Sequence, residues 1–178
     1  MGRYVTFVFC IGFLFFITPA VAWDLPDFQA NDLEGESVSL SELVEDTDLV
    51  VISFWLADCD ACNRILPYLQ AFHETYGSEG LQTIIVYIQY QCSEDDGCCY
   101  LESGNFTMPI LINNTGELQD LFSVHGFPHT VIVDPEGKLL YNGCGYCPGC
   151  ETCIQQLIHC ELLGRNPLPS EIVNLSDQ

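Results

Sequence analysis

Apolar positions along this chain follow two different periods, and the change of period predicts its central elements. The runs Leu49–Trp55 and Leu81–Ile88 are continuous apolar stretches rich in β-branched residues, which is typical of buried strands. Between them, apolar residues recur at helical spacing and predict a helix from near Asp60 to near Gly77: Ile65, Leu66, Leu69 and Phe72. Strand, helix and strand form a βαβ unit, so the two strands are expected to run parallel with a right-handed crossover.

Shorter elements are expected on both sides of this unit. Residues 91–105 have weak periodicity and are expected to form a loop with at most a short helix. The other predictions, in chain order, are a turn at Asn31–Gly35, a strand at Ser37–Leu40, a helical turn at Ser41–Leu43, a strand at Met108–Ile112, a helix at Gly116–Val124, a strand at Thr130–Val133, a turn at Asp134–Gly137, a return strand at Lys138–Tyr141 and a helix at Glu151–Leu163. No repeat or interdomain linker is visible, so the chain is interpreted as one α/β domain.

The first 22 residues have the pattern of a secretory signal peptide. Arg3 precedes the apolar stretch Val5–Ile17, and Ala20-Val21-Ala22 is a small-x-small end, which predicts cleavage after Ala22. The alternative is an uncleaved membrane anchor, since Val5 to Ala22 spans 18 residues, the lower limit for a spanning helix. The expected organisation is a signal peptide (1–22), a folded domain (23–165) and a polar tail (166–178), with the protein located in the periplasm or secreted.

Net charge and cysteine content indicate which partners are not expected for this chain and whether its cysteines are oxidised. The formal net charge is −21, because 25 Asp and Glu residues face only 4 Lys and Arg. Nucleic acids and anionic membrane surfaces are therefore excluded as expected partners. Of 11 cysteines, Cys10 would leave with the signal peptide, and an even number would remain. Export to an oxidising compartment together with even, clustered cysteines predicts disulfides rather than free thiols.

A Cys-x-x-Cys motif lies where the first buried strand gives way to the helix. Cys59 is then at the N-terminus of the helix, where unpaired N–H groups and the helix dipole stabilise a thiolate. Cys62 is one turn further on the same face and can close a disulfide. The same spacing occurs in half of a zinc site, but the strand–motif–helix context favours a dithiol redox centre.

The order of these parts is similar to the thioredoxin superfamily, specifically to its exported TlpA/ResA-like disulfide reductases. The resemblance covers roughly Leu25 to Leu163. Its motifs are Leu25-Pro-Asp-Phe28, Phe54-Trp55, Cys59-x-x-Cys62, Pro67, Gly126-Phe127-Pro128 and Gly137-Lys138. It implies a thioredoxin-like fold, which is a central mixed sheet flanked by helices, with an added N-terminal β-hairpin.

The resemblance also implies site residues. Pro128 is expected to be cis and to pack beside Cys59 and Cys62, leaving the preceding backbone free to pair with an extended substrate. Trp55 and Phe127 are expected to contact that substrate. Three features depart from the family pattern. Asp58 precedes the first cysteine where Trp is usual, Asp60-Ala61 lies between the cysteines where a proline is common, and Ser53 replaces an acid or Asn.

The remaining cysteines fall into two clusters. One is the loop with Cys92, Cys98 and Cys99, and the other is the C-terminal run of Cys144, Cys147, Cys150, Cys153 and Cys160. Structural disulfides are the favoured interpretation, while a metal site and a second redox pair stay open. Each cluster contains an odd number of cysteines, so at least one disulfide is expected to join the two clusters unless each keeps a free thiol. His129 is interpreted as a partly exposed loop residue, with a position beside the active site as the alternative.

The predicted function is an exported thiol–disulfide oxidoreductase acting as a reductase. Cys59 attacks a substrate disulfide and Cys62 resolves the mixed disulfide. The reductase direction is predicted because Asp58 and Asp60 disfavour the Cys59 thiolate. The expected partners are protein thiols or disulfides and a redox partner protein, with a monomeric chain and no organic cofactor or metal at Cys59 and Cys62. The alternative is a metal-handling protein that uses the C-terminal cysteines.

Overall fold

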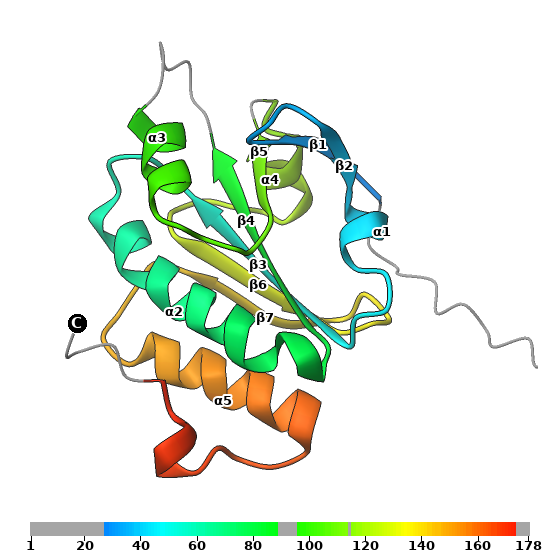
Figure 1. The fold of residues 1–178 in the computed structure, drawn as a ribbon, viewed down its shortest axis with the longest axis vertical. Helices are drawn as coiled ribbons and strands as arrows, with labels where there is room; N and C mark the ends of the chain where they lie inside the picture. Colours follow the sequence, from blue (N-terminus) through cyan, green and yellow to red (C-terminus); the bar gives the residue numbers. More distant parts are fainter. Residues whose placement is uncertain (1–26, 89–95, 114, 174–178) are drawn as a thin grey trace, which may run out of the picture.

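A seven-stranded mixed sheet with helices on both faces forms the centre of the molecule (Figure 1). The computed structural model describes residues 27–88, 96–113 and 115–173, so the predicted signal peptide lies outside the described residues. The strand order is β2-β1-β5-β4-β3-β6-β7. Within the described ranges, no helix is long and apolar enough to cross a membrane.

The elements agree closely with the predicted βαβ unit. β3 (Leu49–Trp55) is buried at every position, α2 covers Asp60–Tyr76, and β4 covers Leu81–Ile88. β3 and β4 are parallel, with Leu49 opposite Leu81 and Trp55 opposite Tyr87. The prediction of this unit is confirmed, because continuous apolar runs are what a strand covered on both faces requires.

The N-terminal hairpin is also confirmed. β1 (Gln29–Asp32) pairs antiparallel with β2 (Ser37–Ser39), and β1 joins the sheet antiparallel to β5 (Ile110–Asn113). The helical turn α1 (Leu40–Leu43) begins one residue before the predicted start. Its N-cap is Ser39, whose hydroxyl accepts from the N–H of Glu42 while the Glu42 carboxylate accepts from the N–H of Ser39.

Two apolar cores lie on opposite faces of the sheet. α2, α3 (Asp96–Ser103) and α5 (Cys150–Leu163) contribute to one core, while α1 and α4 (Glu117–Leu121) contribute to the other. The strands β6 (His129–Val133) and β7 (Leu139–Cys144) complete the sheet as an antiparallel pair. β7 is longer than predicted, because it pairs with β6 as far as His129 opposite Cys144.

The residues that follow α5 return along it and form the 3-10 helix η2 (Pro169–Glu171) (Figure 1). The buried Gln155 holds this segment: its side-chain N–H groups donate to the Tyr76 hydroxyl (2.8 Å) and the Glu171 carbonyl (2.7 Å), and its carbonyl oxygen accepts from the Val173 N–H (2.9 Å). Arg165 forms two hydrogen bonds to the Glu171 carboxylate at 2.7 and 2.8 Å. Residues 166–173 are therefore packed against the domain.

Candidate active site

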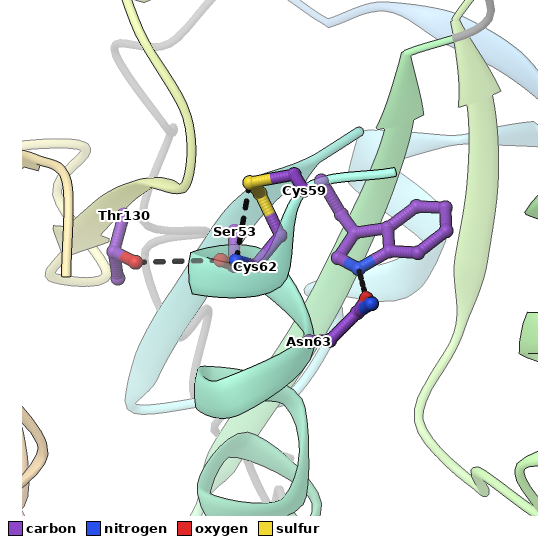
Figure 2. The surroundings of a disulfide bond; sticks show 6 residues. Ser53, Cys59, Cys62, Asn63 and Thr130 are labelled. Carbon is purple, nitrogen blue, oxygen red and sulfur yellow. Dashed lines mark hydrogen bonds between the residues drawn. A yellow bond between two sulfur atoms is a disulfide. The ribbon is translucent and has the colours of Figure 1, made fainter. Parts of the chain in front are cut away.

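Cys59 and Cys62 form a disulfide at the start of α2 (Figure 2). Cys59 is the N-cap of the helix, and its sulfur accepts a hydrogen bond of 3.2 Å from the Cys62 N–H. Cys62 is fully buried in the core, whereas Cys59 is partly exposed. The predicted position of Cys59 at a helix N-terminus is thus observed, and one sulfur of the pair is far more accessible than the other.

The turn between β3 and α2 gives this site its shape. Asp58 has φ of 61°, in the left-handed region that Asp and Asn tolerate better than most residues. Both Asp58 and Asp60 are exposed beside the disulfide. A hollow of about 240 Å³ opens here, and it is lined by Trp55, Ala57, Asp58, Asp60, Asn63 and Tyr100. The surface next to the disulfide is therefore acidic.

Trp55 ties the end of β3 to the first turn of α2. Trp55 is only 2% exposed, and it lines the hollow. The indole N–H donates to the side-chain oxygen of Asn63 at 3.1 Å (Figure 2). The ring also stacks on Tyr100, with centroids 5.7 Å apart. Asn63 was not predictable from the sequence, since an Asn on the first turn of a helix carries no signal of a tertiary partner.

Ser53, at the position where the family resemblance implies an acid or Asn, forms one half of a pair of hydroxyls. Ser53 on β3 and Thr130 on β6 are directly opposite in the sheet, and their side-chain oxygens are 3.3 Å apart (Figure 2). Both residues are buried, on the face of the sheet that α2 covers. Unlike an ionised carboxylate, a neutral hydroxyl does not accept a proton at neutral pH, so this pair can hydrogen-bond but cannot act as a general base.

The Phe127–Pro128 peptide bond is cis, as the family resemblance implied. Pro128 is buried, and Phe127 packs against both cores. Since His129 is opposite Phe54 in the sheet, Pro128 lies alongside the end of β3, just ahead of the turn that carries Cys59. A contact of Pro128 or Phe127 with substrate stays a prediction.

His129 is buried, not partly exposed as expected. It lies on the far side of the sheet from Cys62, edge-on to Phe54 with ring centroids 6.1 Å apart. Its Nε2 contacts the side-chain oxygen of Asn142. Burial lowers the pKa of His129, so the neutral ring is the stable form at neutral pH.

The profile of the AhpC/TSA family matches residues 21–142, more than half of the chain. The chain belongs to the AhpC/TSA family. Within it, the chain is similar to two proteins named thiol-disulfide oxidoreductase ResA. That of Oceanobacillus iheyensis is 28% identical over 64% of this chain and 59% of the relative, and that of Bacillus subtilis is 25% identical over 66% and 63%. The chain thus spans about three fifths of the length of these relatives.

Solved structures share the fold of this chain. The chain is similar to the exposed lipoprotein thioredoxin Etrx1 of Streptococcus pneumoniae, with a TM-score of 0.62 and 22% identity over 75% of this chain and 98% of that one. It is also similar to a thiol:disulfide interchange protein from Bacteroides sp., with a TM-score of 0.61 and 24% identity over 75% and 87%. The predicted fold class and the ResA-like resemblance within the thioredoxin superfamily are confirmed.

The C-terminal cysteines of this AhpC/TSA family member are only partly oxidised, although disulfides were expected in place of free thiols. Cys147 and Cys150 form a disulfide with each other, while Cys144, Cys153 and Cys160 are thiols. No tail cysteine bridges to the loop cluster. Cys99 of the loop cluster is also a thiol, so the exception that was left open, a free thiol in each cluster, applies. Cys92 lies outside the described residues. Among the residues that the structure describes, no three His, Cys, Asp or Glu side chains are grouped as a metal site.

Proposed function

We propose that the chain is an exported thiol–disulfide oxidoreductase that reduces disulfides of protein substrates. The observation that carries the proposal is the Cys59–Cys62 disulfide, with one accessible sulfur at the N-terminus of a 17-residue helix and one buried sulfur behind it. The names of the ResA relatives support the same activity. The predicted signal peptide supports export to the periplasm or beyond the cell.

In the reduced protein, the two cysteines have different tasks. Cys59 attacks a substrate disulfide as a thiolate, because the helix dipole and the Cys62 N–H both favour negative charge on its sulfur. One substrate sulfur leaves as a thiolate, and a mixed disulfide forms. Cys62 then attacks Cys59, which closes the Cys59–Cys62 bond and releases the second substrate sulfur. Two electrons and two protons pass to the substrate, and a partner dithiol restores them.

The acidic surface around the disulfide supports the reductase direction. Asp58 and Asp60 oppose the negative charge of the Cys59 thiolate, so the reduced form is stabilised less than in a strong oxidase. We expect a reduction potential below about −180 mV, nearer the thioredoxin value of about −270 mV than the oxidase value of about −120 mV.

Substrate contact is assigned to the surface between the hollow and the cis-proline loop. Trp55 lines the hollow, and Phe127 precedes the cis bond. An extended substrate strand would pair with the backbone next to Pro128 and place its sulfur in front of Cys59. The chain is proposed to act as a monomer and to receive electrons from a redox partner protein.

The decisive experiment compares single cysteine variants. The mature protein should accelerate insulin reduction by dithiothreitol, Cys59→Ser should abolish this activity, and Cys160→Ser should leave it unchanged. Cys62→Ser should trap mixed disulfides with proteins, which reductant releases, whereas Cys59→Ser should trap none. Equal trapping by both variants, or no activity in the wild-type protein, would contradict the proposal.

A further inference from the structure

The Cys147–Cys150 disulfide lies in a position that resembles the active-site disulfide. Cys150 is the first residue of α5, a 14-residue helix, and Cys147 is exposed just before it. The N–H of Cys147 donates to the sulfur of Cys150 at 3.0 Å. The stabilisation from a disulfide grows with the length of the loop that it closes. A bridge with a sequence separation of three therefore adds little to the stability of the fold.

The segment with this disulfide lies against the active-site loops. The N–H of Gly145 donates to the carbonyl of Pro128 at 2.7 Å, so the chain leaves β7 beside the cis-proline loop. A Cβ on Gly126 would be 2.7 Å from the sulfur of Cys144, which shows how closely this thiol packs on the same loop. In Figure 1, α2 and α5 lie side by side and begin at the same end of the molecule.

Tyr146 connects the segment with α2. Tyr146 packs against the core that contains Cys62. It also lies close enough to Tyr68 and Arg64 on α2 for their charges to affect the pKa of its hydroxyl. Burial is the largest cause of its raised pKa, followed by the charge of Glu151. Tyr146 thus holds the residue next to it, Cys147, beside the turns of α2 that follow the active-site cysteines.

We propose that the Cys147–Cys150 disulfide is a second thiol–disulfide exchange site, which accepts electrons from the Cys59–Cys62 dithiol of the same chain. This inference rests on the proposed function, because Cys59 must act as the nucleophile.

The exchange balances without a further reactant. The Cys59 thiolate attacks the exposed sulfur of Cys147, the Cys147–Cys150 bond breaks, and Cys150 leaves as a thiolate. The N-terminus of α5 and the Cys147 N–H stabilise that leaving group. Cys62 then attacks Cys59, so one disulfide has formed and one has become a dithiol. The second dithiol can pass its electrons to a substrate disulfide at an exposed surface.

The first readout tests whether the second disulfide exchanges at all. In the full-length mature Cys59→Ser/Cys62→Ser variant, glutathione redox buffers should convert Cys147–Cys150 from mostly oxidised to mostly reduced while circular dichroism stays native. Alkylation followed by peptide mapping measures the reduced fraction. A Cys59→Ala/Cys62→Ala version serves if serine at the buried position prevents folding. A disulfide that stays oxidised in the folded protein throughout overturns the inference.

The second readout tests transfer between the sites. In Cys62→Ser/Cys150→Ser, oxidation at high dilution should join Cys59 to Cys147 at least tenfold more often than to Cys160, near the other end of α5. Equal joining to both overturns the inference. If the wild-type protein fails to reduce insulin while Cys147–Cys150 still exchanges with glutathione, the proposed function is wrong. The proposed electron transfer from Cys59–Cys62 to Cys147–Cys150 is then wrong as well, because it needs Cys59 as the nucleophile. If insulin is reduced but no Cys59–Cys147 bond forms, only the further inference fails.

Discussion

The hydrogen bond between Trp55 and Asn63 predicts how firmly the active-site turn is held. Asn63→Ala removes the acceptor of the indole N–H, and the Trp55 ring is only 2% exposed. A buried donor without a partner costs about 1–3 kcal/mol. The adjoining hollow lets water reach part of this site, so the expected loss is about 1–2 kcal/mol. For a domain of this size, that lowers the melting temperature by roughly 2–8 °C.

Asn63→Asp is the matched control. A carboxylate keeps an acceptor for the indole N–H and adds negative charge in the first turn of α2, which the helix dipole favours. Its unfolding free energy should therefore stay within about 0.5 kcal/mol of the wild-type value. Urea unfolding of the oxidised proteins, followed by circular dichroism and tryptophan fluorescence, measures both variants. If the Ala variant were as stable as wild type, or the Asp variant as unstable as the Ala variant, the hydrogen bond would not be what holds the turn.

Three further predictions concern charge and the C-terminal segment. Asp58→Asn keeps a side chain that tolerates φ of 61° but removes a negative charge beside Cys59. Equilibration with glutathione should therefore show the Cys59–Cys62 dithiol favoured over its disulfide about two- to fivefold more than in the wild-type protein. An unchanged equilibrium would refute the charge argument. Arg165 lowers the pKa of Glu171 to about 2, so the stability that this ion pair contributes is present above pH 4.5 and is lost between pH 4.5 and about 2. Accordingly, Glu171→Gln should lower the melting temperature at pH 7 but not at pH 2, and a pH-independent difference would contradict this. Gln155→Leu removes three hydrogen bonds and should speed hydrogen exchange at the Val173 amide at least tenfold, measured by NMR, whereas Gln156→Leu on the exposed face of α5 should not.

The sequence predicts those parts of the fold that local patterns determine. β3, α2 and β4 were predictable because each buried face repeats at the period of its element. The position of Cys59 followed from the same boundary between strand and helix. The cis bond before Pro128 came from the family resemblance, since general preferences favour trans.

Contacts between distant polar residues were not predictable. Gln155 is a polar residue on a helix, and two of its partners are backbone groups of residues 171 and 173, which carry no side-chain signature. The Ser53–Thr130 pair likewise joins residues 77 positions apart. The pairing of the C-terminal cysteines could not be predicted either, because parity requires a bridge between the clusters only where every thiol is oxidised, and it does not show which sulfurs lie close.

The two disulfides share a feature that the composition helps to explain. Nearby positive charge stabilises a thiolate, yet the chain has 4 Lys and Arg against 25 Asp and Glu. Helix N-termini supply positive potential from the backbone alone, without a basic side chain. Cys59 and Cys150 each lie at such a terminus, and in each pair a backbone N–H donates to the sulfur. In so acidic a chain, thiolate chemistry is therefore expected at helix N-termini. Cys160 lies near the opposite, negative end of α5, and its thiol donates a hydrogen bond to the side-chain oxygen of Asn166, so it lacks the positive potential that Cys59 and Cys150 have.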